Sequence, residues 1–250
     1  MITRSQRSIR GVVLAAALAI LAAGCLPAPA TEEAQQVTTL YGVFVAIAAV
    51  IALIVFGLAT WAILRHRQKP GDPLPDQSHG SLRVEFIWTA IPVLIILGLF
   101  AGTLAVLGRV DAHNPNPGVE LRVEAFRWGW TFSYPGSGVS VTGITPDGPE
   151  AVLPVGEPIK IVVASHDVIH AFFVPVFLFK RDAIPGRESA FDVTIDEPGT
   201  YRGQCAEFCG IYHSRMPFSI RAVSRAEFDQ WLASQPRASP PAEGSPVASP

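Results

Sequence analysis

Twelve residues near the end of the chain gather four side chains that bind soft metal ions. The segment from Cys205 to Met216 holds two thiols, an imidazole and a thioether, at Cys205, Cys209, His213 and Met216, with Glu207 between the thiols. Thiolate, thioether and imidazole are the ligands that copper prefers, whereas hard ions select oxygen. A single-copper blue site uses one cysteine, so the second thiol allows two metal ions to be bridged. The sequence therefore predicts a two-copper loop.

One more histidine is needed to complete a two-copper site, and His170 lies upstream.

Two other interpretations of the loop are possible besides copper binding. Cys205 and Cys209 can form a disulfide in an exported domain, but a disulfide does not require His213 and Met216 at fixed offsets. Zinc accepts two cysteines and two histidines, but it gains little from a thioether. Taken alone, His170 is more often a packed core histidine, and only the loop makes it a ligand.

The pattern Cys-x-Glu-x-Cys-x-x-x-His-x-x-Met in this loop resembles the binuclear copper (CuA) loop of subunit II of the cytochrome c oxidases. The resemblance runs from about Leu40 to about Leu232. It implies that six residues form the site, which are His170, Cys205, Glu207, Cys209, His213 and Met216. The two cysteines would bridge two copper ions, and each histidine would bind one of them. The methionine would be a weak ligand on one metal, and the glutamate would offer its backbone carbonyl to the other. The side chain of that glutamate would also reach a magnesium ion at the border with subunit I.

Two long uncharged runs precede this region, at Leu40–Leu64 and Phe86–Gly108. At about 1.5 Å per residue, each run is long enough for a hydrocarbon core of ~30 Å. A buried helix of a soluble domain is the alternative for either run, but two such runs flanked by charged loops argue against it. The loop between them, residues 65–85, holds four basic residues, which are Arg65, Arg67, Lys69 and Arg83. The positive-inside rule places this loop in the cytoplasm. Residues 109–234 then lie on the outer, periplasmic face of a bacterial cell membrane.

Residues 1–24 have the pattern of a secretory signal, with three arginines before the apolar run Val12–Leu21. Small residues follow and lead to Cys25, which resembles the cysteine of a bacterial lipobox. The resemblance implies that Cys25 is lipidated and becomes the mature N-terminus, followed by an outer segment, residues 25–39. Ala22 stands where a lipobox usually has leucine. There are two other interpretations. The signal is cleaved and the cysteine stays unmodified, or the segment is not cleaved.

The second apolar run begins with Glu85-Phe-Ile-Trp-Thr-Ala-Ile-Pro92, which is similar to the Glu-x-x-Trp-Thr-x-x-Pro signature of the same family. The resemblance implies that Glu85, at the cytoplasmic edge of the membrane, helps protons enter an uptake channel of subunit I. A glutamate that only anchors the helix at the interface is the alternative interpretation.

From residue 120 onward, short runs rich in Val, Ile, Phe and Thr alternate with Gly and Pro. The expected strands are Leu121–Phe126, Trp130–Tyr134, Pro158–Ala164, Ala190–Ile195, Thr200–Gly203 and Pro217–Val223. This pattern is typical of a β-sandwich or small barrel. The resemblance implies an all-β, cupredoxin-like Greek-key barrel preceded by a two-helix transmembrane hairpin. We expect a short helix over Ser224–Ser234 with a capping box at Ser224 and Glu227. Residues 235–250, rich in Pro, Ser and Ala, are expected to be disordered.

The segment Arg127-Trp-Gly-Trp is the third match to the family, in which a Trp-x-Trp pair follows a glutamine. There the first tryptophan lies at the surface over the copper site and accepts the electron from cytochrome c. The resemblance gives that role to Trp128, whereas Trp130 is expected to pack in the core. Arg127 replaces the glutamine and places a positive charge where a cationic cytochrome would dock. This departs from the charge pattern by which a cationic cytochrome usually docks in the family.

The resemblance implies the subunit through which electrons enter a proton-translocating cytochrome c oxidase, from cytochrome c or a similar one-electron donor. The chain has no basic patch with interleaved aromatics, which argues against nucleic-acid binding. It also lacks a haem-binding pattern and further intramembrane histidines, so oxygen reduction would lie on subunit I, beside other oxidase subunits. A copper subunit of a related reductase that acts on nitric oxide is one alternative. A non-redox subunit of a quinol oxidase is another, and the full ligand set argues against it.

Overall fold

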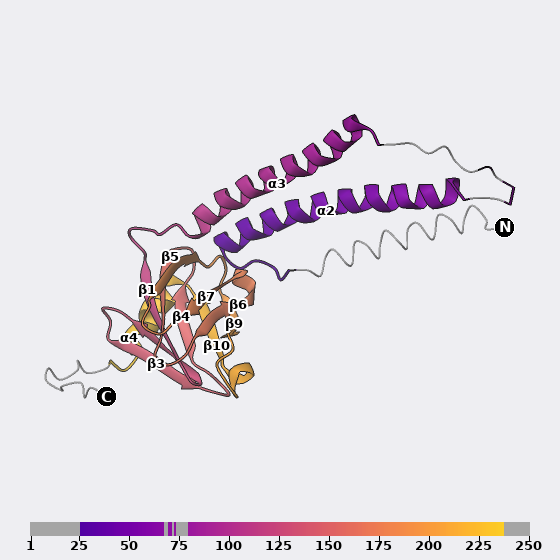
Figure 1. Ribbon diagram of the computed structural model, residues 1–250. Coiled ribbons are helices and arrows are strands. Elements are labelled where there is room, and N and C mark those ends of the chain that lie inside the picture. Colours follow the sequence, from indigo (N-terminus) through magenta and orange to yellow (C-terminus); the bar gives the residue numbers. More distant parts are fainter. Residues whose placement is uncertain (1–25, 68–69, 72, 74–79, 238–250) are drawn as a thin grey trace, which may run out of the picture. The chain divides into compact units, whose positions relative to one another are not determined.

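The computed structural model describes residues 26–67, 70–71, 73 and 80–237, which form two compact units. The helical unit comprises the described residues of 36–111. The β unit comprises the described residues up to Gln35 and from Ala112 onward. The expected signal, the lipobox cysteine Cys25 and the tail from residue 238 lie outside the described residues (Figure 1).

Two long apolar helices make up most of the first unit (Figure 1). Helix α2 spans Glu32–Arg65 and helix α3 spans Leu82–Val110, and both are long and apolar enough to cross a membrane. In α3 no residue is buried, and in α2 only Ala34 is. Apolar side chains exposed along whole helices require an apolar solvent. Both helices begin before the predicted apolar runs because polar first turns precede them, with Glu32 and Glu33 in α2.

The start of α2 is held by the β unit. The amide of Ala30 donates to Val176 O at 3.0 Å, and its carbonyl accepts from the amide of Asp196 at 3.1 Å. The Glu33 carboxylate accepts from the Thr194 amide at 3.2 Å. Within the segment predicted as outer, residues 25–39, α2 therefore begins at Glu32, and Ala30 and Glu33 are bonded to the β strands and loops.

The β unit is built from two five-stranded sheets (Figure 1). The first sheet has the order β3-β2-β1-β5-β8, with β3 Val139–Ile144, β2 Gly129–Tyr134, β1 Val119–Phe126, β5 Pro158–Ser165 and β8 Ser189–Thr194. The second has the order β4-β10-β9-β6-β7, with β4 Glu150–Pro154, β10 Pro217–Val223, β9 Gly199–Cys205, β6 His170–Val174 and β7 Phe179–Ala183. Only β1 with β5 and β10 with β4 pair in parallel among the named strands. The expected architecture of two apolar helices before an all-β domain is confirmed.

All six predicted strands are present, and four more were not predicted. Strands β3, β4 and β6 have only five or six residues each, and β7 carries the charged run Lys180–Asp182. Lys and Asp are depleted in strands in general, and pairing with β6 overrides that preference in β7. Helix α4 spans Arg225–Ser234, and the predicted capping box is formed, with both reciprocal bonds between Ser224 and Glu227. Arg237, within the tail expected to be disordered, forms an isolated antiparallel bridge with Val139.

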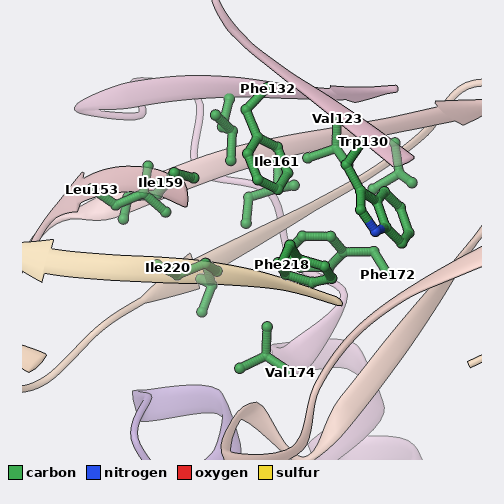
Figure 2. Close-up of a cluster of buried hydrophobic side chains, with 14 of the residues drawn as sticks. Val123, Trp130, Phe132, Leu153, Ile159, Ile161, Phe172, Val174, Phe218 and Ile220 are labelled. Atoms are coloured by element: carbon green, nitrogen blue, oxygen red, sulfur yellow. The ribbon is translucent and has the colours of Figure 1, made fainter. Parts of the chain in front are cut away.

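The core lies between the two sheets, and three aromatic residues, Trp130, Phe172 and Phe218, lie together in it (Figure 2). Phe172 of β6 stacks on Phe218 of β10 with ring centroids 4.6 Å apart. Trp130 of β2 is fully buried and packs edge-on against Phe218 at 5.1 Å. Its indole Nε1 donates to Met216 O at 3.4 Å. The predicted packing role of Trp130 is therefore confirmed, and this tryptophan ties the core to the loop.

Candidate metal centre

The predicted ligands come together from two strands and the loop that follows one of them. His170 is the first residue of β6, and Cys205 is the last residue of β9. These strands are neighbours, with Phe172 paired to Cys205, so His170 lies beside the loop. The loop is closed where the Cys205 amide donates to Met216 O at 3.1 Å, directly before β10 begins. The hairpin of β9 and β10 thus projects Cys209, His213 and Met216 from one connection.

The two sulfurs lie at the middle of the site. Cys205 Sγ and Cys209 Sγ are 3.8 Å apart. Cys205 Sγ lies 3.8 Å from His170 Nδ1 and 3.2 Å from Glu207 O. Cys209 Sγ lies 3.7 Å from His213 Nδ1 and 3.8 Å from the Met216 sulfur. Each sulfur therefore has its own histidine nitrogen, and all six predicted ligand residues are gathered in one place.

The donor set fits a soft metal. A metal–thiolate bond is about 2.3 Å long, so one ion can bond both sulfurs across the observed gap of 3.8 Å. The ligand atoms of His170, Cys205 and Cys209 all lie within 4.8 Å of one another. Both cysteines are free thiols here, so the disulfide alternative is not the arrangement in this structure. The thioether of Met216 is buried and aimed at Cys209, which suits copper better than zinc.

Burial raises the pKa of both thiols, but their other contacts shift the two pKa values in opposite directions. Burial raises the pKa of Cys205, but contacts with His170 and with backbone groups of Glu207 and Ala171 outweigh it, so this pKa lies well below its usual range. Burial and the charge of Cys205 raise the pKa of Cys209. The folded chain therefore favours a single thiolate. A bound metal ion would displace the second proton, because coordination deprotonates a thiol.

Asp167 orients the buried histidine. Its Oδ1 lies 2.9 Å from His170 Nε2, which leaves Nδ1 directed at Cys205. A carboxylate behind a ligating imidazole fixes the ring and its tautomer. Burial alone would raise the pKa of Asp167, but hydrogen bonds from His170, Val168 and Arg127 hold that pKa far below its usual range.

Arg127, the departure from the family pattern, is not a free charge. Its backbone amide donates to Asp167 Oδ2 at 2.8 Å, and its side-chain Nε donates to the same oxygen at 3.2 Å. The positive charge expected beside the docking point is therefore paired with the carboxylate that orients His170.

Trp128 lies directly on the loop. Its indole Nε1 donates to Cys209 O at 3.1 Å, and its ring meets the Tyr212 ring edge-on at 5.0 Å. Gly210 has a φ of +114°, and a Cβ there would lie 3.1 Å from the Trp128 ring. Only glycine allows this approach without displacement. Gly210 and Tyr212 were not predicted as site residues, because their contacts with Trp128 join positions far apart in the sequence.

Two glutamates were predicted to have roles besides holding copper, and the structure describes both. The side chain of Glu207 points to Lys180, with the two charged atoms 3.6 Å apart, while its carbonyl faces Cys205. Glu85 lies in the first turn of α3, within the helical unit. The magnesium and proton-path roles of these glutamates therefore stay predictions, and so does lipidation of Cys25.

Two family models match the chain. The transmembrane domain of cytochrome c oxidase subunit II matches residues 19–106, and the periplasmic domain of cytochrome c oxidase subunit II matches residues 144–223. The second match includes all six predicted ligand residues.

Individual proteins are similar over most of the chain. A probable cytochrome c oxidase subunit 2 of Streptomyces coelicolor is 32% identical over 83% of this chain and 77% of its own length. One from Nocardia farcinica is 30% identical over 92% of this chain and 82% of its own length. The solved periplasmic domain of subunit II of cytochrome oxidase from Bradyrhizobium japonicum is 34% identical over 48% of this chain and 95% of its own, with a TM-score of 0.46.

Proposed function

The chain belongs to the family of subunit II of cytochrome c oxidase, and from this premise we propose that it accepts electrons from cytochrome c at a binuclear CuA centre. As a member of this family, it is one subunit of a haem–copper terminal oxidase. The electrons would pass to haem in subunit I, where oxygen is reduced to water and protons are translocated. The observation that carries the proposal is the ring of ligands around two thiols 3.8 Å apart.

Six residues would hold the metal, which are His170, Cys205, Cys209, His213 and Met216 by their side chains and Glu207 by its carbonyl. Two copper ions would supply a one-electron acceptor whose charge is spread over both metals, which keeps structural change on reduction small. The chain's own contribution is rigidity. Asp167 fixes the orientation of His170, and the buried ring of Trp130 holds the carbonyl of Met216. Ligands fixed before the electron arrives need little reorganisation.

Trp128 provides a path from the surface to the loop. Its indole is half-buried and bonded to the carbonyl of a ligand cysteine at 3.1 Å. An aromatic ring in this position can contact a bound donor on one side and the metal-binding loop on the other. We therefore propose Trp128 as the point at which the electron enters.

The other roles rest on the family alone. We propose that α2 and α3 cross a bacterial cell membrane as a two-pass hairpin, with the β unit on the periplasmic face. We propose that Glu85 assists proton uptake, that Glu207 reaches a magnesium ion at subunit I, and that Cys25 carries a lipid. Release of Glu207 from Lys180 would be required before its carboxylate could bind a cation at that border.

Replacing one bridging thiol in the intact oxidase tests the proposal. Cys209→Ser should lower cytochrome c-driven oxygen consumption by more than about 100-fold, because the metal loses a ligand that no neighbour can replace. The haem absorption spectrum of the complex should be unchanged. Ser214→Ala, an exposed change in the same loop, is the matched control and should keep full turnover. Full turnover of the Cys209→Ser complex with reduced cytochrome c would refute the proposal.

A further inference from the structure

Exposed apolar side chains in the β unit gather at the metal-binding loop. Among the described residues of this unit, the large hydrophobic side chains that are exposed are Ile144, Ile169, Phe208, Ile211 and Tyr212. Ile169 precedes the ligand His170, and the last three belong to the Cys205–Met216 loop. Single exposed hydrophobic residues are normal, but a concentration of them at one end of a domain marks an interaction site.

Tyr212 contacts the half-buried Trp128, and Ile144 and Ile211 lie next to residues that contact it. Tyr212 contacts its ring at 5.0 Å, and Ile211 follows Gly210, whose backbone packs against the same ring. Ile144 ends strand β3 opposite Gly129, and the next amide, Thr145, donates to Trp128 O at 2.9 Å. We call Trp128, Ile144, Ile211 and Tyr212 the docking patch. Ile211 is 80% exposed and Ile144 is 62% exposed, although nothing in the fold requires either to be apolar.

The charges around the docking patch cancel. Asp167 is bonded to Arg127, and Glu207 is paired with Lys180. The remaining charged side chains of the site loops are Asp147 and Arg215, both exposed, and neither forms an ion pair with any residue that the structure describes. They contribute one negative and one positive charge. A surface selected to attract a lysine-rich partner would carry an excess of unpaired carboxylates.

We propose that the docking patch receives an electron-carrier protein whose cofactor edge is exposed within an apolar rim of near-zero net charge. This inference rests on the proposed function, and it specifies the class of donor. The carrier is held by apolar contacts with Ile144, Ile211 and Tyr212, and its cofactor edge lies against Trp128. One electron leaves the carrier and enters the metal site, and no bond forms or breaks and no proton moves. Because apolar contact is not screened by salt, docking depends little on ionic strength.

Two probe proteins separate apolar docking from electrostatic docking in the purified oxidase. The first is a lysine-rich c-type cytochrome, and the second is the same protein with its lysines acetylated, which removes their charge. Rates of their oxidation are compared between about 10 mM and about 150 mM salt, where the Debye length falls from about 30 to about 8 Å. We expect both rates to change by less than about threefold, with the acetylated form at least as fast as the basic one. A basic cytochrome that is tenfold faster at low salt overturns the inference.

Variants at Ile211 locate the contact. Ile211→Ser should raise the KM for the acetylated cytochrome about three- to tenfold with kcat and the metal-site spectrum unchanged, since the lost contact is made in binding. Ile211→Asp adds a negative charge, so the variant should oxidise the basic cytochrome faster than the acetylated one. That rate of oxidation should fall as the salt concentration rises. Thr200→Ala is the control, because it is exposed at the far end of β9, about 16 Å from Cys205 at roughly 3.3 Å per residue.

The outcomes also separate this inference from the proposed function. An unchanged KM in Ile211→Ser, in an oxidase that Cys209→Ser inactivates, overturns the docking inference and leaves electron acceptance in place. Loss of subunits from the Ile211→Ser complex overturns it as well, because the patch would then be covered inside the assembly. Full activity of Cys209→Ser with either cytochrome refutes the proposed function itself.

Discussion

The helical unit and the β unit both expose apolar side chains, but in different patterns. Exposed apolar residues run along the whole of α2 and α3, from Tyr41 to Leu107, with no preferred region. In the β unit the described apolar residues are buried between two sheets, and the exposed ones gather at the metal-binding loop. Apolar side chains exposed along a whole helix are expected where lipid is the solvent. Apolar side chains exposed in one small region are expected where another protein binds.

Exposure alone therefore does not identify an interface. The exposure of Leu97 on α3 indicates contact with lipid, because the apolar surface around it is uniform and as long as a bilayer is thick. The exposure of Ile211 indicates a binding surface because this residue lies in the same loop as the candidate metal ligands, close to Trp128. Substitutions of the same kind in the two units should therefore have different consequences.

The largest effect should come from truncating a buried aromatic of the β unit. Trp130→Ala removes a fully buried ring that packs on Phe218 and holds Met216 O, so we expect the β unit to lose about 3 to 5 kcal/mol. The measurement is the temperature at which the purified subunit unfolds, together with its metal content. Phe100→Ala on α3 is the counterpart, since Phe100 is exposed and should cost little in lipid. Equal losses in the two variants would remove the distinction between the two units.

A charge placed on each exposed surface should give the next largest effect. Leu97→Arg puts a cation near the middle of α3, where insertion becomes less favourable by about 2.5 to 3.5 kcal/mol. We expect a marked fall in the amount of subunit recovered from the membrane fraction. Ile211→Arg should leave that amount unchanged and alter only donor oxidation. If Leu97→Arg inserted normally, α3 would not face lipid at that position.

A smaller effect should follow from removing the charge that orients His170. Asp167→Asn keeps the shape of the side chain but weakens its hydrogen bond to Nε2, so we expect metal affinity to fall about 10- to 100-fold. Competition with a chelator, followed by the visible spectrum, measures this change. The variant also leaves Arg127 unpaired, and donor oxidation should then slow with the lysine-rich cytochrome more than with its acetylated form. Unchanged affinity would show that the protein holds His170 by packing alone.

The grouping of the candidate ligand residues could be predicted better than the strands around them. Five of the six candidate ligand residues could be predicted because few sites other than a copper centre require thiol, imidazole and thioether side chains at fixed offsets. Only the family resemblance added Glu207. Six of the ten strands could be predicted because their apolar composition is itself a local signal, although the apolar strand β6 was missed. Strand β7, with its charged residues, was not predicted, because its pairing with β6 is a tertiary effect without a local signal.

Contacts between distant residues also lay beyond the sequence. The ion pair of Arg127 with Asp167 joins positions 40 residues apart, and it reverses the interpretation of Arg127 as a free positive charge. The bond from Trp128 to Cys209 O joins residues 81 positions apart. Polar side chains have many possible partners, and only the fold selects one.

The proposed function depends on two copper ions held between two thiolates at one end of the β unit. Its sharpest test compares the copper content and the electron paramagnetic resonance spectrum of the purified oxidase with those of its Cys209→Ser variant. We expect the variant to lose two copper ions per chain, together with a signal from one unpaired electron shared equally by two copper nuclei. Equal copper content in the two complexes, or a signal from a single copper nucleus in the unaltered protein, would contradict the binuclear site.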